Sequence, residues 1–183
     1  AAACLVLTWM LATAAIAQDT RPRVPPERDP SGVAIALISA GIDYTQPAIA
    51  ARLARDGEGE LIGWDLEAND NRPFDRSGGT TPAEWGGDGT ALAHLIVAQP
   101  GVRLVAVRIV PADPVSPARA ALFVAQTPAR VAIVPLRLTR ETWGPFAQAT
   151  SRAQDVLFLV PQSETGELTL LAGLDNVLVV AAQ

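Results

Sequence analysis

Short, continuous apolar runs alternate with amphipathic or polar stretches along most of this chain. Runs rich in β-branched residues predict strands that are buried on both faces, as in a parallel sheet. Such runs occur at 33–38, 60–64, 103–110, 131–136, 156–160 and 177–181. Helices are predicted between them, at 46–55, 90–98, 117–125 and 145–153. Strands that alternate with helices in this way predict an α/β fold, a three-layer sandwich around a mostly parallel sheet.

The N-terminal residues 1–17 form an uncharged apolar segment that ends in Ala15-Ile16-Ala17. Small residues at this place are typical of a secretory cleavage site, so we expect the protein to be exported. As a helix the segment would span about 25 Å, slightly less than the roughly 30 Å hydrocarbon core of a bilayer. We expect a retained signal-anchor that holds the protein on the periplasmic side of a bacterial inner membrane. A cleaved signal peptide is the alternative.

Residues 18–30 are rich in Pro and Arg and separate the apolar segment from the rest of the chain. This composition predicts an extended, semi-rigid linker. We assign residues 31–183 to one α/β domain, which agrees with the usual size of a domain.

The charged residues and the single Cys and His restrict the possible functions. The 14 basic residues are all Arg, and together with 19 acidic residues they give a net charge of −5. This balance argues against nucleic-acid binding, which needs basic side chains to neutralise phosphates. One His and one Cys, Cys4, cannot build a zinc cluster or a disulfide framework. We therefore expect no cofactor and no metal.

A polar loop at 65–75 gathers several carboxylates. They are Asp65, Glu67, Asp70 and Asp75. Carboxylate-rich loops can bind Ca²⁺, although this spacing does not follow the EF-hand pattern. A solvated turn held by Asx hydrogen bonds is the interpretation that we favour, and a cation site is the alternative. We expect the tryptophans nearby and downstream to pack in the core or to anchor loops. These are Trp64, Trp85 and Trp143.

Stretches from three parts of the domain together resemble one enzyme family. They are VAIALISAGIDYTQPAI at 33–49, GWDLEANDNRPFDRSGGTTPAEWGGDGTALAHLI at 63–96, and VLFLVPQSETG with LAGLDNVLVVAA at 156–166 and 171–182. They are similar to segments of the subtilases, the subtilisin-like serine peptidases. The first resembles the strand and turn with the catalytic Asp, and the second resembles the loop and helix with the catalytic His. The last two resemble the oxyanion-hole segment and the strand that follows it.

The residues that carry catalysis in this family are replaced here. Ser39 stands where the family's Asp-x-Gly motif has its Asp, and Asp88 stands at the first His of its His-Gly-Thr-His motif. Ala91 takes the second His position, and Ser163 takes the place of the oxyanion Asn. The chain contains no Gly-Thr-Ser nucleophile motif. The resemblance thus implies a degenerate, C-terminally truncated subtilase-like domain.

These replacements remove the chemistry of a catalytic triad, which needs a nucleophilic hydroxyl, an imidazole base and an orienting carboxylate. His94 is the one imidazole, and it lies about 600° of rotation and 9 Å of rise beyond Asp88 on a helix. We expect His94 to be a hydrogen-bonded structural residue and Asp88 to cap the helix that follows it. Ser39 is expected at the carboxyl end of a central strand, and we expect no catalytic role for it.

We therefore expect a non-catalytic pseudo-peptidase domain that acts as an exported, membrane-tethered accessory or structural subunit of a protein complex. Its partners would be proteins, and the membrane through residues 1–17. A parallel sheet that is cut short leaves an unpaired edge and an apolar face for a partner to protect. The alternative is a serine peptidase or other hydrolase whose active site is relocated or completed by a separate polypeptide. A third possibility is an inhibitor or chaperone that binds peptides in the former substrate cleft.

Overall fold

The structure is a computed structural model, and it describes residues 32–74, 89–110, 112–136, 139–162, 171 and 173–181. The expected apolar segment 1–17 and the linker 18–30 lie outside these residues. Among the helices of the described part, none has both the length and the apolar composition of a membrane-spanning segment.

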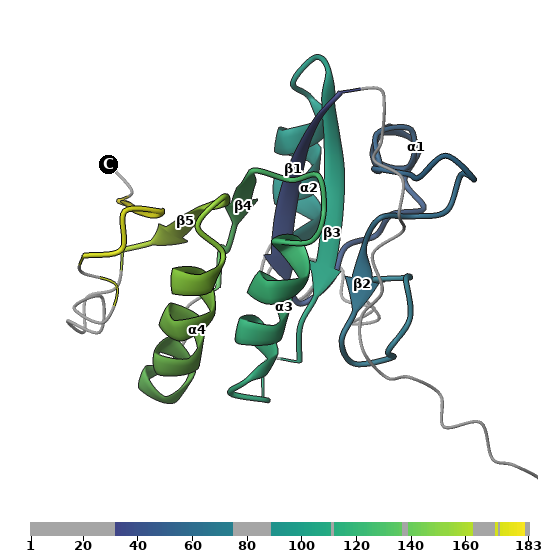
Figure 1. The fold of residues 1–183 in the computed structure, drawn as a ribbon. Coiled ribbons are helices and arrows are strands. Elements are labelled where there is room, and N and C mark those ends of the chain that lie inside the picture. The colour runs from purple at the N-terminus through teal and green to yellow at the C-terminus, as the bar shows by residue number, and fades with distance from the viewer. Residues whose placement is uncertain are drawn as a thin grey trace, which may run out of the picture.

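A six-stranded sheet forms the centre of the molecule, with the strand order β2-β3-β1-β4-β5-β6 (Figure 1). All pairings between neighbouring strands are parallel. The strands are β1 (Val33–Ser39), β2 (Trp64–Asp65), β3 (Val102–Arg108), β4 (Val131–Ile133), β5 (Leu157–Pro161) and β6 (Val177–Val180). The expected α/β fold around a mostly parallel sheet is therefore confirmed for the described residues.

Helices lie on both faces of the sheet and make the molecule three layers thick (Figure 1). The helices are α1 (Pro47–Ala50), α2 (Gly89–Val97), α3 (Ser116–Val124) and α4 (Arg140–Arg152). On one face, α3 and α4 enclose a core that includes Phe123, Phe146 and Phe158. On the other face, α1 and α2 enclose a smaller core around Leu37 and Leu104. The sheet thus separates two hydrophobic cores of different size.

The connection through α2 has an unusual hand. The connections β3-α3-β4 and β4-α4-β5 both move toward β6 and carry their helices on the same face (Figure 1). The connection β2-α2-β3 moves in the same direction, yet α2 packs on the opposite face. The connections through α3 and α4 have the right-handed form that about 98% of such crossovers adopt. The connection through α2 has the opposite hand and is therefore left-handed.

Two helices differ from the expected bounds. The helix expected over 46–55 ends at Ala50, because the chain then pairs with β3: Leu53 bridges to Leu104, and the Ala54 N–H donates to the Leu104 carbonyl at 2.8 Å. The helix expected to start at Pro145 starts at Arg140 instead. Its start is fixed by a capping box, in which the Thr139 N–H donates to the hydroxyl of Thr142, three residues into the helix, at 3.0 Å. Pro145 lies inside this helix.

Several strands are shorter than expected or shifted by a few residues. The strand expected over 60–64 is reduced to Trp64–Asp65, with Leu61 in an isolated bridge to Arg55. The strand expected over 131–136 ends at Ile133. The other strand ends lie within about two residues of those expected, which is the usual uncertainty of element boundaries.

Candidate functional site

Polar side chains end three adjacent strands at the carboxyl edge of the sheet, where open α/β sheets usually bind their ligands. Ser39 is the last residue of β1, Asp65 of β2 and Arg108 of β3. The register pairs Arg108 with Ser39 on one side and with Asp65 on the other. This edge is therefore the candidate site.

Ser39 is buried, and its hydroxyl is used within its own turn. Only 1% of the residue is exposed. Its Oγ donates to the Gly41 carbonyl at 3.2 Å and accepts from the Gly41 N–H at 3.2 Å. Its own carbonyl accepts the Ile109 N–H at 2.8 Å. Ser39 thus stabilises the turn that follows β1.

The amino end of α2 packs directly against this turn. A Cβ atom on Gly89 would lie 2.2 Å from the Gly41 carbonyl oxygen and 2.9 Å from Ser39 Oγ, so only glycine fits there. The buried hydroxyl of Thr90 accepts the Asp43 N–H at 2.9 Å. The structure therefore brings the position after Asp88 against Ser39. Asp88 and Ser163 themselves lie outside the described residues, so their roles stay predictions.

His94 belongs to a chain of polar side chains beside α2. Its Nε2 lies 2.5 Å from Gln46 Oε1, and Gln46 Nε2 donates to Asp43 Oδ2 at 3.2 Å. The Thr45 hydroxyl donates to Asp43 Oδ1 at 2.5 Å. This hydrogen bond from Thr45 is the largest cause that lowers the pKa of Asp43, with further contributions from Gln46 and from the nearby charge of His94. His94 is therefore hydrogen bonded, as expected, and its structural role stays a prediction.

The described side chains do not connect the histidine to a nucleophile. Both hydrogen bonds of the Ser39 hydroxyl go to Gly41. In the part of the chain that is described, the imidazole of His94 is hydrogen bonded to Gln46, and no hydroxyl or thiol is hydrogen bonded to it. Nucleophilic catalysis of the triad type uses a base within hydrogen-bond reach of the nucleophile.

Arg108 connects the ends of the strands. Its Nε donates to the Ala40 carbonyl at 3.0 Å, and its Nη1 pairs with Asp65 Oδ2 at 3.0 Å. Its Nη2 pairs with Glu67. The side chain of Arg108 is 12% exposed and that of Asp65 is 0% exposed. An ion pair between the buried Asp65 and the largely buried Arg108 therefore occupies the candidate site between β1, β2 and β3.

The second oxygen of Asp65 organises the acidic loop. Asp65 Oδ1 accepts the N–H groups of Glu67 and Ala68, both at 2.8 Å, and Asp70 Oδ1 accepts the Arg72 N–H at 2.8 Å. These are the Asx hydrogen bonds that the sequence predicted for the loop 65–75, of which the structure describes residues 65–74. Asp75 lies outside the described residues. Within the described ranges, no three His, Cys, Asp or Glu residues are grouped so as to hold a metal ion.

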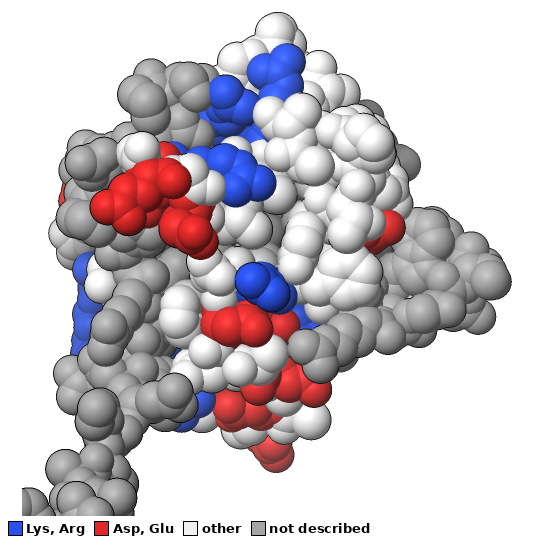
Figure 2. Space-filling view, turned by 90° about the vertical axis from the view of Figure 1, so that its right-hand side faces the viewer, with Lys and Arg blue, Asp and Glu red and all other residues white. Residues whose placement is uncertain are grey.

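Charges of both signs are mixed on the face of the molecule that carries β2. Figure 2 shows basic and acidic side chains interspersed among uncharged ones on this face.

The two described tryptophans of this part of the chain pack in the core, as expected. Trp143 is 1% exposed, and its ring centroid lies 5.7 Å from that of Phe146. Trp64 packs on Phe123 at 6.2 Å. The indole N–H of each is buried without a hydrogen-bond partner among the described residues. Trp85 lies outside them.

Sequence reasoning missed the residues that complete both clusters. Asp43, Gln46 and Arg108 were not singled out. Gln46 contacts His94 and Arg108 contacts Asp65, whereas Asp43 is connected to His94 through Gln46. The Asp-x-Thr pattern at 43–45 is a signal for a local Asx turn. No local signal pairs Arg108 with Asp65, because that contact depends on the order of the strands.

Comparison with known proteins supports the fold. Neither a family model nor a curated protein matches the sequence. Among solved structures, the chain is similar to the 1.95 Å crystal structure of a mutant epidermin leader peptide processing serine protease (EpiP) from Staphylococcus aureus. The TM-score is 0.50 at 11% sequence identity, and the match covers 80% of this chain and 45% of the protease chain. The chain thus spans less than half of that protease and shares with it a distant subtilase-like fold.

Proposed function

We propose that this chain is a non-catalytic pseudo-peptidase domain that serves as an exported, membrane-tethered accessory subunit of a protein complex. One observation carries the proposal. Ser39 stands at the position that resembles the catalytic Asp of the subtilases. It is 1% exposed, and its hydroxyl is hydrogen bonded to the backbone of Gly41. A serine in this state supplies neither the charge that stabilises an imidazolium nor a free nucleophile.

The other candidate groups are poor substitutes for a triad. Asp88 stands at the position of the family's catalytic His, and a carboxylate is a far weaker general base than an imidazole. The imidazole of His94 is held by Gln46. The Arg108 side chain is paired with Asp65 at the carboxyl ends of β2 and β3. These residues favour a binding role over a hydrolytic one.

Purification from native membranes tests the proposed role. The full chain would be affinity-purified after detergent solubilisation, and co-purifying proteins would be identified by mass spectrometry. A stoichiometric protein partner, together with intact residues 1–17, is the expected result. A chain that begins at Gln18 and purifies without a partner would contradict both the tether and the subunit role.

A fluorophosphonate probe tests the hydrolase alternative in the same preparation. We expect no labelling of this chain. Labelling that disappears in Ser39→Ala or Asp88→Ala would overturn the non-catalytic proposal in favour of a relocated active site. Labelling of a co-purified chain that needs this chain for its reactivity would favour an active site completed between two polypeptides.

A further inference from the structure

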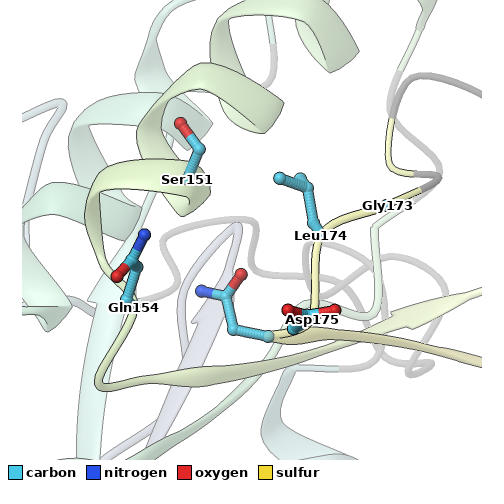
Figure 3. Close-up of a pocket in the computed structure, with 6 residues that line it drawn as sticks. Ser151, Gln154, Gly173, Leu174 and Asp175 are labelled. Carbon is cyan, nitrogen blue, oxygen red and sulfur yellow. The ribbon is translucent and has the colours of Figure 1, made fainter.

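Polar side chains beyond the strand ends gather in a hollow at the end of α4 and in a row beside α2. The hollow has a volume of about 390 Å³, and Ser151 and Gln154 face Asp175 across it (Figure 3). The Ser151 hydroxyl there donates to the Gln148 carbonyl at 2.8 Å, within its own helix. The row beside α2 ends at His94, and its hydrogen bonds follow one another. Each bond in that row therefore fixes the direction of the next.

Helix α2 holds the turn after β1 at two points. Thr90 and His94 lie one helical turn apart, so both face the same side of α2. Thr90 Oγ1 accepts the Asp43 N–H at 2.9 Å. His94 Nε2 lies 2.5 Å from Gln46 Oε1. The backbone of Gln46 is held as well, because its carbonyl accepts the Ala50 N–H at 2.8 Å at the start of α1. The imidazole and the amide are thus held in contact from both sides.

The carboxylate of Asp43 sets the direction of the row. Its Oδ1 accepts the N–H and the hydroxyl of Thr45, at 3.1 and 2.5 Å. The hydrogen bond from the Thr45 hydroxyl is the largest cause that lowers the pKa of Asp43. The group is therefore ionised at neutral pH, and an ionised carboxylate only accepts hydrogen bonds. Hence the side-chain nitrogen of Gln46 must be the atom that faces Asp43, at 3.2 Å from Oδ2.

The amide of Gln46 passes this direction on to the ring. With its nitrogen toward Asp43, its carbonyl oxygen Oε1 faces His94. A carbonyl oxygen accepts hydrogen bonds and donates none, so Nε2 of His94 must carry a proton. In the described part of the chain, Nδ1 of His94 has no hydrogen-bond partner. Nδ1 is therefore the ring atom that is left to take up or release a proton.

We propose that Gln46, oriented by Asp43, holds the neutral imidazole of His94 as the Nε2–H tautomer, with Nδ1 as its basic atom. This polarity is the opposite of that in a catalytic triad, where Nε2 takes the proton of the nucleophile and Nδ1–H faces the carboxylate. A polypeptide that completed an active site at His94 would have to bring its nucleophile to Nδ1. Gln46 and Asp43 are thus positioning residues for the one imidazole of the chain, whether or not the chain is a subunit of a complex.

Nitrogen NMR can test the tautomer on a single residue. Because the chain contains one His, isotope-labelled histidine gives the ring signals of His94 alone when the affinity tag contains no histidine. The full chain would be measured in detergent micelles, at increasing pH until the ring signals stop changing and the neutral form is observed. We expect the signal of a protonated nitrogen for Nε2 and that of an unprotonated nitrogen for Nδ1. A neutral ring with its proton mainly on Nδ1 would overturn the proposal.

A variant of Gln46 shows whether this side chain sets the tautomer. Gln46→Met removes the acceptor at a similar side-chain length and should raise the fraction of the Nδ1–H tautomer about tenfold. Gln126→Met is the matched control, at an exposed glutamine that is hydrogen bonded to the Leu122 carbonyl of α3, and it should leave the fraction unchanged. An unchanged fraction in the Gln46 variant, with an unchanged unfolding midpoint, would refute the role of Gln46.

An exchange of the two side chains separates hydrogen bonding from packing. In the double variant Asp43→Asn/Gln46→Glu, the amide and the carboxylate trade places without a change in length. The new carboxylate accepts from Nε2 of His94, and the new amide donates to that carboxylate. We expect the Nδ1–H fraction to return from the level of Gln46→Met to that of the wild type. A fraction that stays at the level of Gln46→Met would contradict the proposed order of donors and acceptors.

The titration of Asp43 reports the other end of the row. Hydrogen bonds from Thr45 and then from Gln46 lower the pKa of Asp43 in the folded protein. Gln46→Met should therefore raise this pKa toward its ordinary value of 3.8, whereas Gln126→Met should not change it. Carbon NMR of the carboxyl group measures the shift. A pKa that is the same in the wild type and in Gln46→Met would mean that the amide nitrogen does not face Asp43, and the assignment of the tautomer would fail with it.

Discussion

Replacing Arg108 by Met should destabilise the domain strongly, because the substitution leaves a buried carboxylate without its cation. Asp65 has a side chain that is 0% exposed, and Arg108 pairs with it at 3.0 Å. Removing one partner of a buried ion pair costs about 3–5 kcal/mol, much of it from the charge left behind. A typical domain has only about 5–15 kcal/mol of stability in total, so this loss is a large fraction.

A second substitution tests whether the uncompensated charge is the cause. Asp65→Asn removes the charge but keeps an acceptor for the N–H groups of Glu67 and Ala68. In the double variant Arg108→Met/Asp65→Asn, we expect about half of the loss to be recovered. Arg119→Met is the matched control, since Arg119 is 62% exposed and lies 3.7 Å from Asp113. Its expected cost is about 0–1 kcal/mol.

Urea unfolding followed by tryptophan fluorescence measures these differences. The free energy of unfolding falls linearly with urea concentration, with a slope that depends on the size of the domain. For a slope typical of this size, Arg108→Met should lower the urea concentration at the unfolding midpoint by about 2 M and leave the slope unchanged. Equal midpoints for the Arg108 and Arg119 variants would refute the argument. So would a double variant that is as unstable as Arg108→Met alone, because the buried charge would then not be the source of the loss.

Three further predictions use the same unfolding assay. Gly89→Ala should lower the free energy of unfolding by about 1–3 kcal/mol, because the new Cβ would clash with the Gly41 carbonyl. Gly144→Ala, where a Cβ in α4 meets no other atom, should raise the free energy of unfolding by about 0.5–1 kcal/mol. Trp143→Ala should cost about 3–5 kcal/mol, but Trp143→Phe less than about 1.5 kcal/mol, since it also removes the unpaired indole N–H. The pKa of Asp43 is lowered in the folded protein. Ionised Asp43 therefore stabilises the folded state at pH values above its ordinary pKa of 3.8, and this contribution is lost as the pH falls through the pKa of the folded state. The deficit of Asp43→Asn should therefore shrink as pH falls below about 4, and a deficit that grows there would contradict this sign.

The apolar runs predicted the sheet well because the strands of a parallel sheet are buried on both faces. The strands expected at 33–38 and 103–110 match β1 and β3 closely, and their alternation with helices gave the three layers. The helix expected over 46–55 was too long, because Ile49 and Leu53 are both buried but only Ile49 lies in a helix. The spacing of apolar residues predicts which side chains are buried, but it does not distinguish a helix from an extended segment that pairs with β3.

Features that depend on strand order lay beyond sequence reasoning. A right-handed crossover is the expectation for any βαβ unit, so the left-handed connection through α2 was not predictable from residues 64–108. The contact between Arg108 and Asp65 has the same origin, because it exists only when β2 and β3 are neighbours. The place of Ser39 at the end of a central strand was predicted from the sequence, but its burial and its hydrogen bonds to Gly41 were not.

The two possible binding surfaces of this sheet differ in what a ligand must displace. A ligand at the carboxyl edge has to compete with the bonds of Arg108 to Asp65 and to the Ala40 carbonyl, and disrupting such a buried pair costs several kcal/mol. A ligand on the exposed side chains of β6, such as Leu178 and Val180, displaces only water. Burying a Leu or Val side chain contributes roughly 1.5–3 kcal/mol when it starts fully exposed. Binding at the edge where the catalytic residues of a subtilase would lie is therefore the more costly of the two.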